Sequence, residues 1–144
     1  MSGYVPPVLP LETPDNAGFF EGARAGELRI QTCLECGRRR HPPRPVCPWC
    51  HSTERAWRPV SGRGRVWSFV VPHPPLLPGF TELAPYNVVV VELDEDPTVR
   101  LIGNLVAEAG DAPKATDIVI GEPVRAVFHH VDDVGFLQWA RSTG

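Results

Sequence analysis

The spacing of hydrophobic residues along this 144-residue chain predicts one short helix near its N-terminus. Apolar residues recur at every third position from Ala17 to Ala23, after the sequence Thr-Pro-Asp at 13–15 and before Gly26. A capping hydroxyl, a proline in the first turn and a glycine stop are typical of helix ends. We therefore expect a helix over about residues 14–25.

Short alternating segments, which are typical of strands, make up most of the remaining chain. One of them, at residues 27–32, leads into the first cysteine. Five more follow the last cysteine between turns rich in glycine, proline and aspartate, at residues 60–71, 86–93, 99–107, 122–131 and 135–141. Five short strands without a long helix between them predict a small β-barrel, and the OB-fold fits this count. An SH3-like barrel or a flat sheet is the alternative.

The composition is that of a soluble globular protein, with 42% hydrophobic and 22% charged residues. The longest aliphatic run, Val88 to Val91, is far too short for a membrane span. The first residues lack the charged and apolar regions of a signal peptide. We therefore expect a cytoplasmic protein with one ordinary domain, or with a small metal-stabilised module joined to a second one.

Charge is distributed unevenly along the chain. Residues 38–65 contain eight arginines and one acidic residue, whereas residues 66–144 contain four basic and eleven acidic residues. A basic patch on an otherwise acidic protein commonly attracts phosphates, nucleic acid or an acidic partner, and a solvated arginine run is the alternative. An acidic barrel half repels a polyanion, which argues against nucleic-acid binding.

The four cysteines carry the most specific signal in the sequence. Cys33 and Cys36 form one C-x-x-C pair, and Cys47 and Cys50 form another after ten residues. Each pair can present two thiolates to one tetrahedral ion, and Gly37 allows the chain to curl back toward the sulfurs. Four thiolates complete the coordination of one structural zinc ion and leave no open position for a substrate.

Two disulfides, or the iron site of a rubredoxin-like electron carrier, are the alternatives to zinc. Iron uses the same four-thiolate geometry, but zinc sites of this spacing are commoner. His51 follows Cys50, and we expect it at the surface because four thiolates already complete the site.

Several segments occur in an order that resembles a known family. These segments are FFEGARAGELRIQTC, HPPRPVCPWC, SGRGRVWSF, APYNVVVVELDE and IGEPV. Together they are similar to the zinc-ribbon/OB-fold proteins that accompany thiolase-fold enzymes acting on acyl-CoA, long catalogued as a domain of unknown function. The resemblance, from about residue 14 to residue 128, implies a mainly β fold in three parts. These are an N-terminal helical segment and lead-in strand at 1–32, a rubredoxin-like zinc ribbon at 33–57 and a five-stranded OB-fold barrel at 58–144.

The resemblance also implies a function. Family members are similar to accessory subunits that sit beside thiolases, hydroxymethylglutaryl-CoA synthases or lipid-transfer-protein-like aldolases. Actinobacterial relatives serve steroid side-chain degradation, in which the thiolase-fold partner cleaves a hydroxyacyl-CoA by a retro-aldol reaction. We therefore expect a non-catalytic, zinc-binding subunit of a hetero-oligomer that docks on such an aldolase and helps to bind acyl-CoA. A scaffold for a thiolase and hydroxymethylglutaryl-CoA synthase pair, or a nucleic-acid-binding ribbon and barrel, is the alternative.

No motif in the sequence predicts an activity of the chain on its own. The chain lacks a G-x-S-x-G elbow, a phosphate-binding glycine loop and an HExxH helix. His129 and His130 are adjacent in a predicted strand, so their side chains point to opposite faces and cannot bind the same atom. Asp132 and Asp133 fall in a predicted turn, where acidic side chains are ordinarily solvated.

Two groups of residues are candidates for binding acyl-CoA or the partner. Arginines between the two cysteine pairs suit CoA phosphates or an acidic partner surface. The proline-rich loop at 72–85 has the length and apolar content of a docking element, and its histidine is placed to reach a neighbour's active site. A loop that folds back over the barrel's open end is the alternative. The candidates are Arg38, Arg39, Arg40 and Arg44 between the cysteine pairs, and His73, Leu76, Leu77, Phe80 and Tyr86 in or beside the loop.

Overall fold

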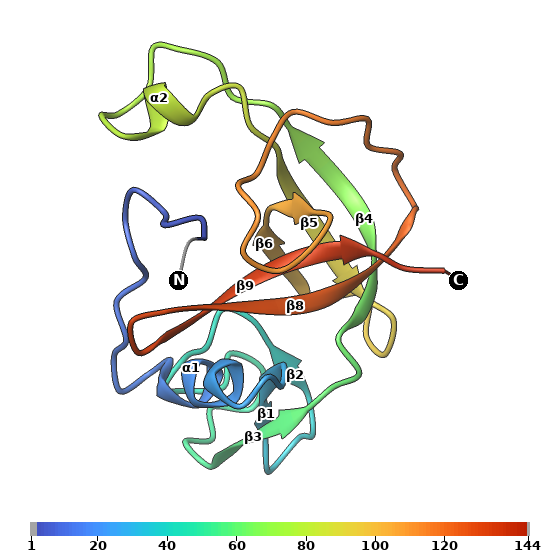
Figure 1. Cartoon of the computed structure of the whole chain (residues 1–144). Coiled ribbons are helices and arrows are strands. Elements are labelled where there is room, and N and C mark those ends of the chain that lie inside the picture. The colour runs from blue at the N-terminus through green and yellow to red at the C-terminus, as the bar shows by residue number, and fades with distance from the viewer. Residues whose placement is uncertain (1–2, 144) are drawn as a thin grey trace.

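The described part of the chain folds into two β-sheets and two short helices (Figure 1). The computed structural model describes residues 3–143. Its elements are α1 (Ala17–Arg24), β1 (Arg29–Cys33), β2 (Arg39–Arg40), β3 (Arg55–Pro59), β4 (Arg63–Val70), α2 (Phe80–Leu83), β5 (Val88–Leu93), β6 (Arg100–Gly103), β7 (Leu105–Val106), β8 (Pro123–Val131) and β9 (Val134–Arg141). This architecture confirms the predicted mainly β class. Neither helix in this range has the length and apolar character that crossing a membrane requires.

The first sheet organises the cysteine-rich part of the chain. Its strand order is β2-β1-β3, and β1 is antiparallel to both neighbours. All five residues of β1 pair with β3, so the strand that leads into the first cysteine is the centre of this sheet. Leu28 and Ile30 are buried, and Gln31 and Thr32 are buried as well. Both faces of β1 are therefore covered.

The second sheet curls because two strands that are consecutive in the chain form its two edges. Its order is β6-β5-β4-β8-β9-β7. β6 pairs antiparallel with β5, β7 pairs parallel with β9, and only Asn104 separates β6 from β7. The sheet must bend until its edges lie one residue apart, which produces a partly open barrel. The prediction of a single strand over residues 99–107 is wrong, because the segment forms two strands and crosses from one edge of the sheet to the other at Asn104.

A buried amide side chain holds this crossing in place. Asn87 has no exposed surface, and its Nδ2 donates to the carbonyls of Leu105 (2.8 Å) and Lys114 (2.7 Å). Its Oδ1 accepts the N–H of Leu105 at 2.6 Å. Asn104 Nδ2 donates in turn to the Asn87 carbonyl. These bonds satisfy backbone groups that leave the strand ladder where the chain changes edges.

One hydrophobic core joins the two sheets and the first helix. Leu28, which lies just before β1, and Ile30, within β1, belong to the same buried cluster as Trp139 of the barrel. The first helix packs directly on β9 because Gly135 has no side chain. A Cβ at Gly135 would lie 2.6 Å from the backbone of Ala23, too close for any other residue without a shift of the helix. The ribbon and the barrel therefore stabilise each other.

The first helix is shorter than predicted. Residues 14–16 form a turn, and α1 begins after Asn16 instead of at Pro14. The Asn16 side chain is directed away from the helix, since its Oδ1 accepts the N–H of Thr13 (2.7 Å) and its Nδ2 donates to the carbonyl of Leu11 (3.1 Å). These bonds stabilise the preceding turn, so the predicted start is wrong by about one helical turn.

Replacing Asn87 with alanine should lower the free energy of unfolding by about 2–4 kcal/mol, because buried backbone groups lose their partner. Thermal unfolding of the variant and of the unmodified protein measures the change. Asn16→Ala is the control, since Asn16 also bonds to backbone but lies nearer the surface. Equal melting temperatures for Asn87→Ala and the unmodified protein would show that the barrel edges meet without this amide.

Candidate metal centre and binding surfaces

The four cysteines meet at one end of the first sheet. Cys33 ends β1, Cys36 follows in the next turn, and Cys47 and Cys50 come from a second turn before β3. All four Sγ atoms lie within 4.8 Å of one another. The sulfurs of Cys33 and Cys50 are 3.5 Å apart, and those of Cys36 and Cys47 are 3.7 Å apart.

These distances suit a tetrahedral metal ion. Zinc–thiolate bonds of about 2.3 Å place the sulfurs about 3.8 Å apart, whereas a disulfide needs about 2.05 Å. All four cysteines are free thiols, so the disulfide alternative is wrong. Four thiolates complete the coordination sphere, so the ion that they hold supports the fold and offers no position to a substrate.

The protonation of the thiols also favours a bound cation. The backbone N–H of Cys36 lowers the pKa of the Cys33 thiol to about 6, although desolvation opposes this shift. At Cys50 the backbone N–H of Ser52 lowers the pKa, but desolvation and the neighbouring thiols outweigh it and raise the pKa to about 11. The cluster cannot ionise fully on its own, and a divalent cation supplies the charge that lets all four thiolates form.

Both cysteine pairs lie in turns of the same shape. The N–H of Gly37 donates to the Cys33 carbonyl at 3.0 Å, and the N–H of His51 donates to the Cys47 carbonyl at 2.9 Å. Gly37 and His51 also share a left-handed backbone, with φ of 78° and 64°. His51 therefore occupies the glycine position of the second turn, where its side chain is exposed, as predicted.

The predicted arginines of the ribbon, which is the segment of residues 33–57, differ in their contacts. Arg38 is exposed, and its guanidinium lies 5.1 Å from the centre of the Trp49 ring. Arg39 forms an ion pair with Asp96 at 3.7 Å, which links the ribbon to the turn after β5. Arg44 is exposed. The ribbon thus presents Arg38 and Arg44 to solvent, while Arg39 shares its charge with the barrel.

Arg40 lies beneath this surface, with 4% of its area exposed. Its Nε donates to Gln31 Oε1, and its Nη2 donates to the Arg44 carbonyl at 3.2 Å. The N–H of Arg44 donates to the same Gln31 oxygen at 2.8 Å. Arg40 and Gln31 therefore hold the loop between the two cysteine pairs. Sequence reasoning missed Gln31, and only its place in the central strand of a covered sheet gives it this role.

The predicted docking loop contains α2, which stands away from the barrel (Figure 1). Leu77 is 72% exposed, and His73 is exposed as well. Leu76 and Phe80 are half-buried. The loop therefore presents some of its predicted residues to solvent and turns others toward the protein.

Phe80 and Tyr86 form one wall of a hollow of about 290 Å³ at this end of the barrel. Their rings are 6.3 Å apart. The N-terminal segment, α2, β5, β6 and β9 complete the lining. It is largely apolar and includes Tyr4, Pro6, Val8, Leu83, Val88, Ile102 and Phe136.

The adjacent histidines lie on opposite faces of β8, as predicted. His129 is buried, with its Nε2 2.8 Å from the Tyr4 carbonyl. His130 is exposed, with its Nε2 3.1 Å from the Arg24 carbonyl. Both rings contact backbone of neighbouring segments. Across residues 3–143, the four cysteines are the one close group of three or more metal-binding side chains.

Two family models match the chain. The model described as "ChsH2, rubredoxin-like zinc ribbon domain" matches residues 20–54, and "ChsH2, C-terminal OB-fold domain" matches residues 57–129. They confirm the predicted ribbon and OB-fold. Together with the sulfur geometry, the ribbon match assigns one structural zinc ion to the four cysteines.

Curated relatives match the chain at substantial identity. The probable enoyl-CoA hydratase alpha subunit of Thermomonospora curvata is 44% identical over 110 residues, 76% of this chain and 32% of that protein. The 3-oxo-4,17-pregnadiene-20-carboxyl-CoA hydratase alpha subunit of Mycobacterium tuberculosis is 39% identical over 130 residues, 90% of this chain and 39% of that protein. The chain thus spans only about a third of the length of these two relatives. A DUF35 domain-containing scaffold protein of Methanothermobacter thermautotrophicus is 35% identical over 104 residues, 72% of each chain.

A solved structure shares the fold. It is titled "Ltp2-ChsH2(DUF35) aldolase", and its matching chain superimposes with a TM-score of 0.77 at 36% identity. The match covers 94% of this chain and 100% of that one. These similarities confirm the family that the sequence motifs indicated.

Cys36→Ser should abolish zinc binding and lower the melting temperature of the whole protein, because metal binding and ribbon folding are one equilibrium. The loss should reach the barrel, since Leu28 and Ile30 share its core. Elemental analysis and thermal unfolding measure the two effects, with Glu35→Ser as an exposed neighbouring control. One equivalent of zinc and an unchanged melting temperature in Cys36→Ser would contradict the assignment, as would near-stoichiometric iron in the unmodified protein.

His51→Gly should keep one equivalent of zinc and raise stability by about 1 kcal/mol, because glycine adopts the left-handed backbone at lower cost. Chemical denaturation measures the gain, and competition with a chromophoric chelator measures zinc affinity. A clear loss of zinc affinity would instead show that the imidazole is a ligand.

Proposed function

Because the chain belongs to the ChsH2 family of zinc-ribbon and OB-fold proteins, we propose that it is a non-catalytic subunit of an acyl-CoA aldolase complex. In this role it docks on a thiolase-fold, lipid-transfer-protein-like aldolase and helps to bind the acyl-CoA. The partner supplies the groups that break the carbon–carbon bond, while the zinc ion of this chain maintains its fold.

The similarity to a chain of the Ltp2-ChsH2(DUF35) aldolase carries this proposal. It extends over nearly the whole of both chains at 36% identity, so it includes the zinc ribbon as well as the OB-fold. The closed zinc site supports the assignment of catalysis to the partner, since a metal surrounded by four thiolates cannot activate a substrate.

For the substrate, we propose an acyl-CoA thioester of a steroid side chain, cleaved by a retro-aldol reaction. The name of the Mycobacterium tuberculosis relative, which specifies a pregnadiene carboxyl-CoA, supports this choice. The proposal is limited to the aldolase because the chain spans only 39% of that hydratase subunit. A scaffold between two thiolase-fold enzymes is the second candidate, favoured by the 35% identity to the DUF35 scaffold protein.

We propose that the partner contacts two surfaces of this chain. One is the α2 end of the barrel, where Leu77 and Ile102 are exposed beside the hollow lined by Phe80 and Tyr86. Exposed apolar side chains next to an apolar hollow are typical of interface anchors. His73, on the same loop, is exposed as well.

The second proposed surface is the ribbon, where Arg38, Arg39 and Arg44 attract acidic groups of the partner and Arg40 holds their loop from below. In this proposal each of the three predicted segments has a separate role. Within the predicted segment 1–32, the described residues from 3 onward brace the barrel. The segment 33–57 docks through the zinc ribbon, and the segment 58–144, described to residue 143, carries the α2 surface and the OB-fold.

The isolated chain should show no aldolase activity, whereas the lipid-transfer-protein-like aldolase of the same organism should be soluble and fully active only with it. Co-expression, copurification and a retro-aldol assay on a steroid hydroxyacyl-CoA test this expectation. An aldolase that is equally soluble and active alone would contradict the proposed function, and copurification of two different thiolase-fold enzymes would favour the scaffold.

Leu77→Ser should weaken aldolase binding about 5- to 30-fold without changing the melting temperature, because Leu77 is exposed in the free protein. Phe80→Ser should instead lower the melting temperature, since its ring packs on Tyr86. Val119→Ser, an exposed apolar residue before β8, is the matched control. Surface plasmon resonance and thermal unfolding separate the two effects. Unchanged aldolase affinity in Leu77→Ser would remove this loop from the interface.

A further inference from the structure

Arg40 is a buried cation without an acidic partner. It has 4% of its surface exposed, and none of the ion pairs among residues 3–143 includes it. Its two hydrogen bonds go to uncharged oxygens, the side-chain amide of Gln31 and the backbone carbonyl of Arg44. A guanidinium has five N–H donors and stays charged at every physiological pH, so its burial without an anion is costly.

Two donors at this place have no acceptor within the described part of the chain. They are Nη1 of Arg40 and Nε2 of Gln31. The oxygen of the Gln31 amide accepts both the Arg40 Nε–H and the Arg44 backbone N–H, so the amide nitrogen must be the group without a partner. Buried donors are normally paired, and a charged donor that lacks an acceptor indicates an anion supplied from outside the chain.

A hollow of about 360 Å³ lies beside Arg40, between the ribbon and the barrel. Arg39, Arg40 and Arg44 line it from the ribbon, and Thr98 lines it from the barrel. None of the described residues that line it is acidic. His41 also lines it, and burial lowers the pKa of His41 to about 4, so this imidazole is neutral near pH 7. The charge of the hollow therefore comes from its three arginines.

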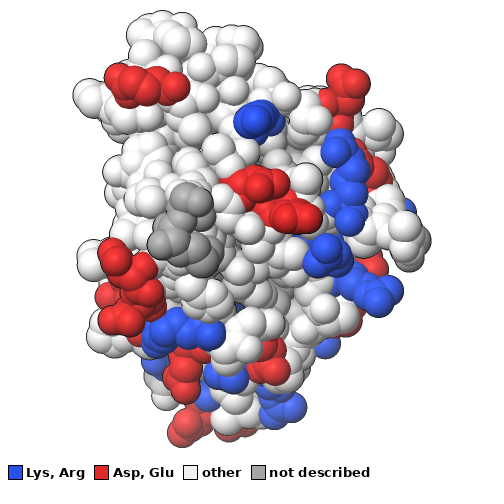
Figure 2. Space-filling view, viewed as in Figure 1, with Lys and Arg blue, Asp and Glu red and all other residues white. Residues whose placement is uncertain are grey.

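The acidic side chain nearest to these arginines is already engaged. Asp96 Oδ2 lies 3.7 Å from Arg39 Nη1, and Asp96 Oδ1 accepts the hydroxyl and the backbone N–H of Thr98. Over residues 3–143, neither Arg40 nor Arg44 forms an ion pair. Figure 2 shows basic and acidic side chains intermixed on the surface at the ribbon end of the molecule, an arrangement that the buried Arg40 lacks.

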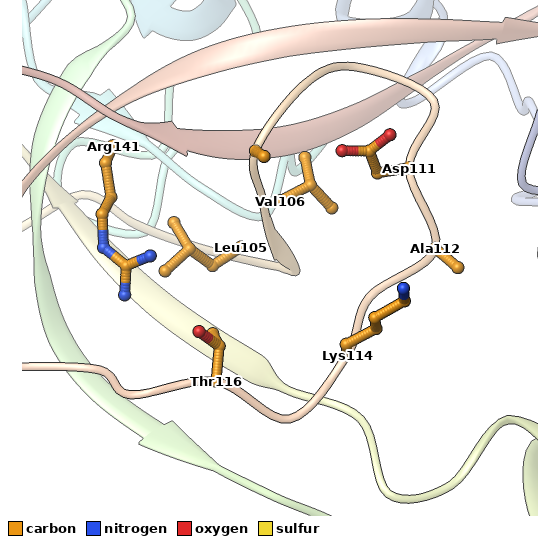
Figure 3. A pocket seen from close by; sticks show the side chains of 8 residues that line it. Leu105, Val106, Asp111, Ala112, Lys114, Thr116 and Arg141 are labelled. Atoms are coloured by element: carbon orange, nitrogen blue, oxygen red, sulfur yellow. The ribbon is translucent and has the colours of Figure 1, made fainter.

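Another hollow, of about 460 Å³, differs because its arginine already has partners. Figure 3 shows Arg141 on one side of it and Lys114 on the other. The Nε of Arg141 lies 2.7 Å from Glu122 Oε1, and its Nη2 donates to the Asp117 carbonyl. Arg141 is also exposed, so water solvates its charge. A cation that is both buried and unpaired distinguishes the hollow beside Arg40.

We propose that the hollow beside Arg40 binds a small free oxyanion, which stabilises the packing of the ribbon against the barrel. Arg40 and Arg44 supply the positive charge, and guanidinium groups bind oxyanions through parallel hydrogen bonds. Because Nη1 of Arg40 is covered, the guanidinium or the loop at residues 41–45 shifts when the anion enters. This site acts in the chain alone and depends on neither the aldolase nor acyl-CoA.

Titration of the zinc-loaded chain with inorganic phosphate, followed by NMR of the backbone amides, tests the site without a variant. Amides of residues 39–45 and 96–99 should shift together and saturate, whereas chloride at the same ionic strength should not produce this shift. Phosphate at ten times its dissociation constant should raise the melting temperature by about 3–6 °C, because it binds the folded state alone.

Variants locate the phosphate on particular side chains. Arg40→Lys keeps the charge but removes the planar guanidinium, and it should weaken phosphate binding about tenfold or more. Arg44→Ala should weaken it about two- to fivefold, since Arg44 is exposed. This variant keeps the bonds that hold the loop, because Arg44 contributes only backbone atoms to them. Arg58→Ala, an exposed ribbon arginine outside the hollow, is the matched control and should bind phosphate unchanged.

Unchanged amides and an unchanged melting temperature in phosphate would overturn the site, as would an equal loss of phosphate affinity in Arg58→Ala. Aldolase binding measured on the same variants separates this proposal from the proposed function. If phosphate has no effect and Arg44→Ala loses the aldolase, the ribbon arginines serve docking and the anion site is wrong. If phosphate binds as expected and no aldolase does, the anion site stands and the proposed function fails.

Discussion

Coordination of one zinc ion by four thiolates is the constraint on which the rest of this structure depends. The sheet of the ribbon is small, since β2 has two residues and β1 and β3 have five each. Short strands of this kind are not stable alone. The first zinc ligand, Cys33, is the last residue of β1. Ile30 of the same strand and Leu28 just before it are part of the barrel's hydrophobic core. The zinc site therefore stabilises more than the ribbon, because the barrel relies on apolar residues that the ribbon sheet positions.

The second constraint is the crossing of the chain between the two edges of the curled sheet. Because β6 and β7 are separated by Asn104 alone, the barrel cannot uncurl without breaking the segment between them. Asn87 and Gln138 are buried at this place and bind the backbone of the following loop, so that an irregular segment keeps a defined shape. Loops held by a rigid scaffold are where proteins commonly build binding sites. This loop forms one wall of a hollow of about 460 Å³.

Three chemically different surfaces result on one small scaffold. The ribbon presents arginines that are free or shared with Asp96, and the α2 end presents apolar side chains beside a hollow. On the acidic barrel, Arg63 of β4 faces Arg125 of β8. Separate surfaces of this kind suit the proposed role, in which the chain contacts a partner enzyme and an acyl-CoA. The closed zinc site adds no reactive position, which agrees with a subunit whose contribution is binding.

The sequence by itself determined the features that depend on short spacings. The two C-x-x-C pairs predict the zinc site because all its ligands lie in two tight turns, and alternation locates the strands because each needs only its own side-chain period. Only the tertiary structure decided the features that depend on pairing between strands far apart in the chain. The segment 99–107 reads as one strand until its two halves are seen to pair at opposite edges. Arg40 is indistinguishable in sequence from Arg38 and Arg39, and its burial follows from its place opposite Gln31 in the covered sheet. Arg63 and Arg125 are far apart in the chain and face each other only through strand register, which no local pattern encodes.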